Sequence, residues 1–309
     1  MFSVRQMRYF EILATTLHFR KAAEMARISQ PALSAQIAEM EMRLGAALFE
    51  RTRRSVVLTD MGKRLLPRIR TILDEIRSLE ELAAQKRGIL KGQLRLGIIP
   101  TIAPYLLPLL VPALHEAYPE LSIELREAVT SKLIEDLRLG DLDALVAALP
   151  IESEGTIARP LFRDRFLVAT STNDIDVLTS PMTQEDVAVE RLLLLEEGHC
   201  LRDQALAVCT NVKRRQLVSY GATSMATLLQ MVSHGMGLTL IPEIAVRTEA
   251  TRNNVRIVAF ADPEPARDIG LIWRKQSERR DDFEALAATI VDCGRQLAIS
   301  ADELKTLAA

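Results

Sequence analysis

The chain has 309 residues, which is too long for one ordinary domain and predicts two or three. Its 48% hydrophobic and 26% charged residues are typical of a globular protein, and no apolar run approaches the roughly 18 residues of a membrane span, so we expect no membrane partner. The odd count of three cysteines and the lack of a secretory signal argue against a secreted disulfide framework and predict a cytoplasmic protein.

Charge is unevenly distributed along the chain, although the formal net charge is only −2. Residues 1–88 carry 16 Lys and Arg against 10 Asp and Glu, a balance of +6. The remaining residues carry 23 against 31, a balance of −8. A basic head on an acidic body favours a protein that binds nucleic acid through its head.

The first sixty residues predict a small helical domain. Apolar residues at helical spacing predict a first helix over about 4–16, and the short alanine-rich run FRKAAEMARI predicts a second. In SQPALSAQIAEMEMRLG, Ser29 is a good N-cap, Pro31 falls in the first turn and Gly45 ends the helix. The apolar stripe of this third helix consists of Leu33, Ile37, Met40 and Leu44.

The opposite face of the third helix carries small, hydrogen-bonding groups near its N-terminus, as a helix that reads base edges in the major groove requires. The segment LFERTRRSVVLTDMG that follows alternates like a short β-wing, and its arginines are placed to neutralise phosphates or to enter a minor groove. The alternative is a small helical bundle with a solvated basic loop. The residues expected at the DNA are Ser29, Gln30, Pro31, Ser34, Gln36, Arg51, Arg53 and Arg54.

A long helix is expected from Thr59 onward, because apolar residues recur there at the heptad spacing of a coiled coil. This seam favours dimerisation, and a single helix lying on its own domain is the alternative. Pro67 removes a hydrogen bond inside the helix, so we expect a kink or a late helix start. Residues 86–92, KRGILKG, are expected to form a hinge. The seam consists of Leu65, Ile69, Ile72, Ile76, Leu79 and Ala83.

From Gln93 onward, apolar β-branched runs alternate with helical patterns such as TSKLIEDLRLG and SMATLLQMVSHG, which predicts parallel sheets with helices on both faces. The expected strands are QLRLGIIP, SIELREA, DALVAALP, FLVATS, LLLLEE, KRRQLVSY, GLTLIP and RDIGLIWR. Sites in such sheets lie at the carboxyl ends of strands. Thr101, Thr130 and the tripeptide GHC at 198–200 each follow an expected strand and are therefore candidate site residues.

The segment LLLEEGHCLRDQALAVCTN holds Cys200 and Cys209 on an expected helix. Nine helical steps place their sulfurs on opposite faces and roughly 13 Å apart along the axis, whereas a disulfide needs Cα atoms within about 7 Å. Pairing therefore requires this segment to unwind. Cys200 lies at the expected helix start beside His199 and near Arg202, and helix N–H groups and a cation favour its thiolate.

The residues alone leave other interpretations of these cysteines open. Two buried cysteines on a helix are more often small hydrophobic residues. A metal site of His199, Cys200 and Cys209 has fewer ligands than the four usual for zinc, so no metal and no cofactor is expected. Cys293 is expected to be a core thiol on the C-terminal helix. Structural roles are expected for His18, His115 and His234.

Head, long helix and body together resemble a LysR-type transcriptional regulator over essentially the whole chain, and KAAEMARISQPALSAQIAEME is similar to the signature of that family's winged helix-turn-helix. The resemblance implies a regulatory body of two Rossmann-like halves, like a periplasmic binding protein. It also implies a homo-oligomer, a dimer of dimers, on promoter sites in double-stranded DNA. The expected domains are 1–60 for the DNA-binding head, 61–90 for the dimerisation helix and hinge, and 91–309 for the body, with halves 91–161 plus 268–300 and 162–267.

Within the family, EEGHCLRDQALAVC is similar to the redox segment of the hydrogen-peroxide-sensing members. Our hypothesis is that peroxide oxidises Cys200 to a sulfenic acid, that Cys209 condenses with it to a disulfide, and that cellular thiol reductants reverse the reaction. The resemblance and the local chemistry bring six residues towards the peroxide, namely Thr101, Thr130, His199, Arg202, Asp203 and Arg267.

Two other functions remain open. One is a regulator that binds a small metabolite between the two halves of the body. The other is a thiol peroxidase, but an enzyme has no need of a DNA-binding head, so we expect a regulator and not an enzyme.

Overall fold

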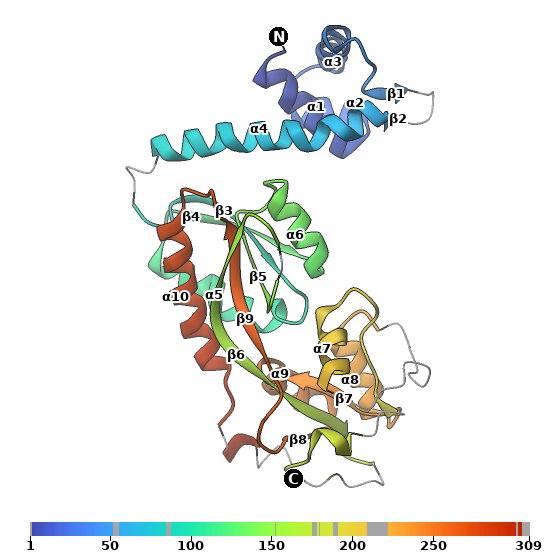
Figure 1. Cartoon of the computed structure of the whole chain (residues 1–309), viewed down its shortest axis with the longest axis vertical. Coiled ribbons are helices and arrows are strands. Elements are labelled where there is room, and N and C mark those ends of the chain that lie inside the picture. Colours follow the sequence, from blue (N-terminus) through green and yellow to red (C-terminus); the bar gives the residue numbers. More distant parts are fainter. Residues whose placement is uncertain are drawn as a thin grey trace. The chain divides into compact units, whose positions relative to one another are not determined.

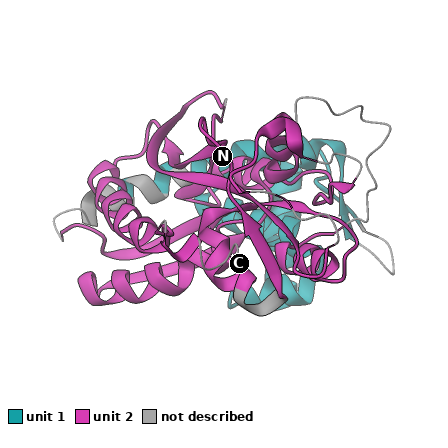
Figure 2. Ribbon diagram, turned by 90° about the horizontal axis from the view of Figure 1, so that it is seen from below, with its two compact units in different colours: residues 1–87 teal, residues 88–309 magenta. Residues whose placement is uncertain are grey.

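Two separate hydrophobic cores divide the chain into residues 1–87 and residues 88–309 (Figure 2). The computed structural model describes residues 2–51, 56–84, 88–151, 153–174, 178, 180–187, 191–208, 222–300 and 302–304. Several predictions lie outside the described residues, namely those on Arg53, Arg54, the side chain of Arg51, the first residues of the expected hinge, the expected strand KRRQLVSY and Cys209.

The first unit contains the three predicted head helices, α1 (Val4–Thr16), α2 (Phe19–Met25) and α3 (Gln30–Leu44). The Ser29 hydroxyl accepts a hydrogen bond from the backbone N–H of Ala32 at 3.3 Å, and Gly45 adopts φ +68° at the other end of α3. Both predicted ends of this helix are therefore confirmed. The core between the helices includes six fully buried side chains, Phe10, Leu13, Leu33, Ile37, Met40 and Leu48.

The predicted wing is present as an antiparallel pair of strands, β1 (Phe49–Arg51) and β2 (Val56–Leu58). Glu41 anchors it to α3, because its carboxylate accepts the backbone N–H groups of Leu48 and Phe49 at 2.8 and 3.1 Å. The alternative of a helical bundle with a plain loop is therefore wrong.

The long helix α4 (Asp60–Ala84) runs through Pro67 without a break in its helical assignment. The expectation of a late start is wrong because Thr59 caps the helix ahead of the proline. Its hydroxyl accepts the N–H of Gly62 at 3.0 Å, and its carbonyl accepts the N–H of Lys63 at 2.9 Å.

The apolar seam of α4 is divided between two surroundings. Ile69 is 1% exposed and, with Leu73, belongs to the core of the head. Ile72 and Leu79, from the same seam, are 43% and 65% exposed. One side of α4 therefore lies on its own domain, and the exposed side chains remain consistent with the predicted dimerisation.

The second unit is built on one seven-stranded mixed sheet with helices on it (Figure 1). The strand order is β4-β3-β5-β9-β6-β7, and β8 pairs with β6. The strands are β3 (Gly92–Ile98), β4 (Leu121–Glu127), β5 (Ala144–Leu149), β6 (Thr156–Ser171), β7 (Thr239–Pro242), β8 (Val255–Val258) and β9 (Ala266–Arg274). The helices are α5 (Ala103–Ala117), α6 (Thr130–Arg138), α7 (Cys200–Val208), α8 (Met225–Ser233), α9 (Glu243–Asn253) and α10 (Arg280–Leu297), with a short 3-10 turn at Gln184–Asp186.

The expectation of parallel sheets is wrong for most of this sheet. Among the ladders of the described residues, β3 pairs in parallel with β4 and β5, whereas the other ladders are antiparallel. The long strand β6 pairs with β9 over residues 156–165 and with β7 and β8 over residues 166–171, so it passes from one half of the unit into the other (Figure 1). Because β9 returns along β6, it enters the sheet against the direction of its neighbours.

The expected strand LLLLEE is not a regular strand. Leu192 and Leu195 form single bridges, with Leu238 and Ala222 respectively. The run is buried and hydrogen-bonded to the chain before β7, since the N–H of Leu193 donates to the carbonyl of Leu238 at 2.8 Å. The leucines of this run are apolar because they are buried, although the run forms no continuous ladder with a neighbouring strand of the described residues.

Burial on α4 predicts a difference between two identical substitutions three residues apart. Ile69→Ala should lower the free energy of unfolding of the head by about 2–5 kcal/mol, because a cavity forms in its core. Ile72→Ala should lower it by less than about 1 kcal/mol, because this side chain is already 43% exposed. Urea denaturation followed by circular dichroism measures both. Equal losses would contradict the assignment of the two faces.

Candidate functional site

Three predicted site residues lie at one edge of the sheet. Thr101 follows β3, Thr130 is the first residue of α6 after β4, and Arg267 is the second residue of β9. The register aligns the ends of these strands, because Ile98 pairs with Glu127 and Leu149 pairs with Asp268. The carboxyl ends of parallel strands meet at such an edge, so the topology gathers these residues as expected.

Arg267 holds Thr101 through two hydrogen bonds. Its Nη1 donates to the Thr101 hydroxyl at 2.9 Å, and its Nη2 donates to the Thr101 carbonyl at 3.2 Å. Its Nε donates to the Asp164 carboxylate at 2.9 Å, across the β6–β9 ladder. The side chains of Arg267 and Asp164 are 1% and 0% exposed, so this is a fully buried ion pair.

Asp164 also caps helix α9, whose own N-cap residue makes no side-chain hydrogen bond. The N-cap of α9 is Pro242, which provides no side-chain hydrogen bond, and the Asp164 carboxylate accepts the N–H of Ile244 at 3.2 Å. Burial raises the pKa of Asp164 above its ordinary value, while the cation of Arg267 and the N–H of Ile244 act in the opposite direction. The carboxylate therefore depends on these two partners.

Two buried polar atoms, one on a predicted site residue and one on the same helix as Cys200, have no hydrogen-bond partner among the residues that the structure describes. One is the hydroxyl oxygen of Thr130 and the other is the amide oxygen Oε1 of Gln204 on α7. A buried polar group without a partner is destabilising, and it indicates a site that a ligand or water completes. Gln204 was not among the predicted site residues.

The predicted sensor Cys200 is the first residue of α7, as expected, and its thiol is free and half-buried. His199 before it is buried. Arg202 donates to the carbonyl of Leu195 at 2.9 Å, whereas Asp203 is exposed and has no ion pair among the described residues. The described contacts do not join any of these four side chains to Thr101 or Arg267.

Cys293 differs from Cys200 in its surroundings. It lies on α10 and is buried in the core, as predicted. Burial raises the pKa of the Cys293 thiol, and the charge of Asp292 acts in the same direction. Since the thiolate is the reactive form of cysteine, Cys293 is poorly suited to react with an oxidant.

The predicted DNA face of α3 is accessible. Ser29, Gln30 and Pro31 are exposed at its N-terminus, and Ser34 and Gln36 are half-buried. The opposite stripe of this helix lies in the head core. An exposed N-terminal face on a helix whose other face is anchored is the arrangement that base reading requires.

The described residues contain no group of three or more His, Cys, Asp or Glu side chains that is placed to hold a metal ion. None of the described helices has both the length and the apolar character needed to cross a membrane. His18 serves a structural purpose, because its Nδ1 accepts the N–H of Lys21 at the start of α2.

Arg267 is predicted from the sequence as a site residue, whereas its partner Asp164 is not. The two residues are 103 positions apart, and only the register of β6 against β9 places them opposite each other. No local pattern marks Asp164, which lies in the polar first part of β6, ahead of the expected strand FLVATS.

A helix-turn-helix head with a wing, attached to a two-part α/β body, is the architecture of a ligand- or signal-responsive transcriptional regulator. Two family models match the chain. The model "Bacterial regulatory helix-turn-helix protein, lysR family" covers residues 4–63, and "LysR substrate binding domain" covers residues 87–293. The protein belongs to the LysR family of transcriptional regulators.

Individual members of this family are also similar to the chain. The chain is 41% identical over 288 residues to the DNA-binding transcriptional dual regulator OxyR of Escherichia coli, covering 93% of this chain and 94% of that protein. A full-length OxyR variant from Pseudomonas aeruginosa has a TM-score of 0.79 at 32% identity, covering 94% of this chain and 98% of that one. A hydrogen-peroxide-bound cysteine variant of OxyR from Corynebacterium glutamicum has a TM-score of 0.67 at 34% identity, covering 99% and 94%.

The buried ion pair predicts a pH-dependent loss of stability in the variant Arg267→Met. Without Arg267, burial raises the pKa of Asp164 further, so the folded protein holds a proton that the unfolded chain releases above about pH 4. The variant should lose about 3–5 kcal/mol of stability at neutral pH, and part of this loss should disappear as the pH falls. Urea denaturation at several pH values measures it. A loss that is independent of pH would contradict the assignment.

Proposed function

We propose that this protein is a DNA-binding transcriptional regulator that responds to hydrogen peroxide through Cys200 and Cys209. The observation that carries the proposal is the 41% identity to the E. coli OxyR protein over 93% of this chain. The free, half-buried thiol of Cys200 at the start of α7 supports it, because helix N-terminal N–H groups favour a thiolate.

The proposed chemistry has two steps. The Cys200 thiolate attacks one oxygen of hydrogen peroxide, the O–O bond breaks, and the hydroxide that leaves takes up a proton to form water. The Cys209 thiolate then attacks the sulfur of the resulting sulfenic acid, so that an S–S bond forms and a second hydroxide leaves. The two thiols together lose two electrons, and a cellular dithiol returns these electrons when it reduces the disulfide.

Helix α7 provides the conformational part of the proposal. Eight helical steps separate Cys200 from Val208 by roughly 12 Å, and one further residue changes this distance by at most about 3.8 Å. A disulfide needs Cα atoms within about 7 Å. As long as Cys200–Val208 stays helical, Cys209 is therefore out of reach, and pairing requires α7 to unwind at least in part.

Unwinding α7 also disturbs its packing. Leu201, Ala205 and Val208 are buried in the core of the second unit on one face of this helix. A disulfide therefore replaces this packing with a covalent link, which gives the protein two discrete states. We propose that these two states present the DNA-binding heads of the oligomer differently to promoter DNA.

Thr101, Thr130, His199, Arg202 and Arg267 are proposed to surround the peroxide, and Gln204 joins them. The hydroxyl of Thr130 and the amide oxygen of Gln204 have no partner among the described residues, and both are suited to hydrogen-bond a small polar molecule. Asp203 is exposed and is the weakest member of the predicted set.

The remaining parts of the proposal follow from the family. The protein acts in the cytoplasm as a dimer of dimers on double-stranded DNA. Its reaction with peroxide is a switch that proceeds once per chain and is not an enzymatic turnover. Sustained peroxide turnover with a small reductant at an enzyme-like rate would contradict this part.

Loss of the sensor thiol tests the proposal. Cys200→Ser should abolish both the Cys200–Cys209 link and the change in DNA footprint after stoichiometric peroxide, because no sulfenic acid can form at residue 200. Mass spectrometry of the thiols and footprinting of the same samples measure the two effects.

Cys293→Ser is the matched control and should keep both responses, because this thiol is buried on α10. A Cys200→Ser variant that still changes its DNA footprint after treatment with peroxide would contradict the proposal. Calorimetry that detects tight, thiol-independent binding of an organic acid to the reduced protein would instead favour a metabolite-responsive regulator.

The DNA contact is tested at Gln30. Gln30→Ala should weaken binding to a duplex selected by the protein from a random pool by about 1–3 kcal/mol, because a glutamine amide pairs with an adenine edge. Binding to a scrambled duplex should change little. Gln93→Ala, at an exposed position of the second unit, is the matched control. Fluorescence anisotropy at fixed salt measures all three proteins, and an equal loss on both duplexes would refute base reading by Gln30.

A further inference from the structure

Thr101 is held in one hydrogen-bonding role. Its hydroxyl oxygen accepts from Nη1 of Arg267, and its carbonyl accepts from Nη2 of the same guanidinium. Arginine has no acceptor, so the hydroxyl proton of Thr101 must point elsewhere. Within the described part of the chain, Thr101 makes no hydrogen bond in which it donates this proton. Arg267 therefore fixes Thr101 as a donor towards whatever lies beside it.

The direction of the Arg267 guanidinium is fixed in turn by Asp164. The Asp164 carboxylate binds Nε of Arg267 at 2.9 Å from the directly opposite position on β6. A guanidinium is planar, so fixing Nε also fixes the directions of both Nη groups. Because both side chains are fully buried, solvent does not compete for these bonds.

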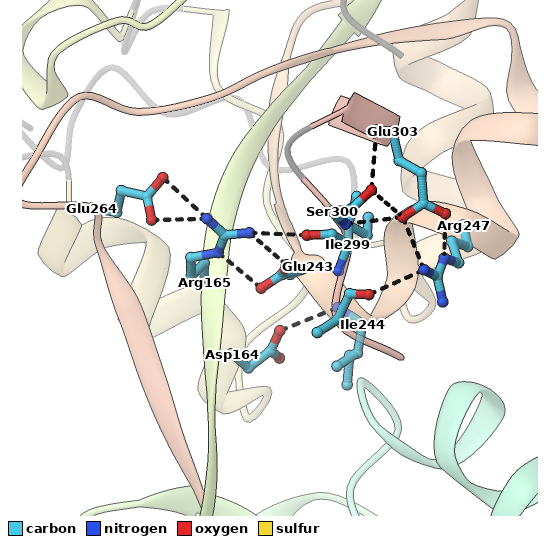
Figure 3. A network of polar contacts seen from close by, with 10 residues as sticks. Asp164, Arg165, Glu243, Ile244, Arg247, Glu264, Ile299, Ser300 and Glu303 are labelled. Carbon is cyan, nitrogen blue, oxygen red and sulfur yellow. Dashed lines mark hydrogen bonds and ion pairs between the residues drawn. The ribbon is translucent and has the colours of Figure 1, made fainter. Parts of the chain in front are cut away.

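Asp164 itself is held by the start of α9 (Figure 3). Its carboxylate accepts the N–H of Ile244. The neighbouring Arg165 binds Glu243 through two hydrogen bonds of 2.6 and 2.9 Å, which joins the first residue of α9 to β6. Glu243 also accepts the N–H of Ile299 at 2.9 Å, so the segment after α10 is attached to the same point.

We propose that Asp164 is a positioning residue for the peroxide reaction. It orients the guanidinium of Arg267 and thereby aims the hydroxyl proton of Thr101 at the peroxide. This inference rests on the proposed function, which places peroxide beside Thr101 and Cys200. Asp164 does not touch the peroxide and acts only through Arg267.

A second buried ion pair in the same unit provides a control that distinguishes a positioning role of Asp164 from a purely structural role. Asp143 binds Arg95 at 2.6 Å, and its side chain is 6% exposed. Its carboxylate also accepts a backbone N–H, that of Arg95 at 2.8 Å, as Asp164 accepts the N–H of Ile244. Among the described residues, the Asp143 side chain contacts Arg95 and Arg279 and makes no contact with Thr101, Arg267 or α7. Asp143→Asn is therefore the matched control for Asp164→Asn.

The experiment compares two reactions of the same thiol in the full-length, reduced protein. One is oxidation of Cys200 by hydrogen peroxide and the other is its alkylation by iodoacetamide, each followed by mass spectrometry. Both reactions use the thiolate, so their ratio cancels any change in thiol ionisation. Asp164→Asn should lower the ratio of peroxide rate to alkylation rate about tenfold or more, and Asp143→Asn should leave it within about twofold.

Each outcome has one meaning. An unchanged ratio in Asp164→Asn, with rapid oxidation in the native protein, overturns the positioning role and leaves the proposed function intact. A native Cys200 that reacts with peroxide no faster than free cysteine overturns the proposed function itself.

A second variant applies if circular dichroism shows that Asp164→Asn is unfolded. Arg267→Lys keeps the positive charge but lacks the planar fork that binds Asp164 and both oxygens of Thr101 together. The same fall in the ratio is expected, and an unchanged ratio overturns the proposal.

Discussion

The ion pair between Asp164 and Arg267 joins the β6–β9 ladder of the second unit to the loop after β3. It is buried, it lies directly across the ladder, and it extends to Thr101 on one side and to the start of α9 on the other. Breaking a buried pair by removing one partner is strongly destabilising, so its geometry is held firmly. A firmly held donor is what selective recognition of a small polar molecule requires.

Helix α7 differs from this firmly held ion pair, because the proposed reaction requires the helix to change its conformation. Its nine helical residues from Cys200 to Val208 span more than a disulfide can bridge, so the proposed link requires a change in this helix. In the proposed function, a firmly held site binds peroxide and a helix that has to unwind completes the chemistry, so that detection is separate from response. The proposed signal is the loss of packing by Leu201, Ala205 and Val208.

The sequence predicted the parts of the fold that local patterns determine. Ser29 and Gly45 mark the ends of α3, and the three-stranded parallel part of the sheet follows from its alternation with helices. The antiparallel course of β9 was not predictable, because strand direction depends on how distant segments return to the sheet. Asp164 was missed for the same reason, since only register reveals its partner.

Site residues that lie within one short segment are predictable from the sequence, whereas site residues that only the fold brings together are not. Cys200 and its neighbours on α7 were found from one motif, and Thr101 and Thr130 from their places after strands. The amide oxygen of Gln204, which has no partner within the described part of the chain, could not be recognised from the sequence, because glutamine on a helix is usually solvated. Burial and the absence of a partner are properties of the folded chain only.

We propose that peroxide links Cys200 to Cys209 and that this link requires α7 to unwind. Hydrogen exchange of the backbone amides of residues 200–208, measured by mass spectrometry before and after stoichiometric peroxide, tests it most directly. We expect these amides to be protected in the reduced protein and to lose protection when the Cys200–Cys209 link forms. A link that forms while the protection of α7 stays unchanged would contradict it.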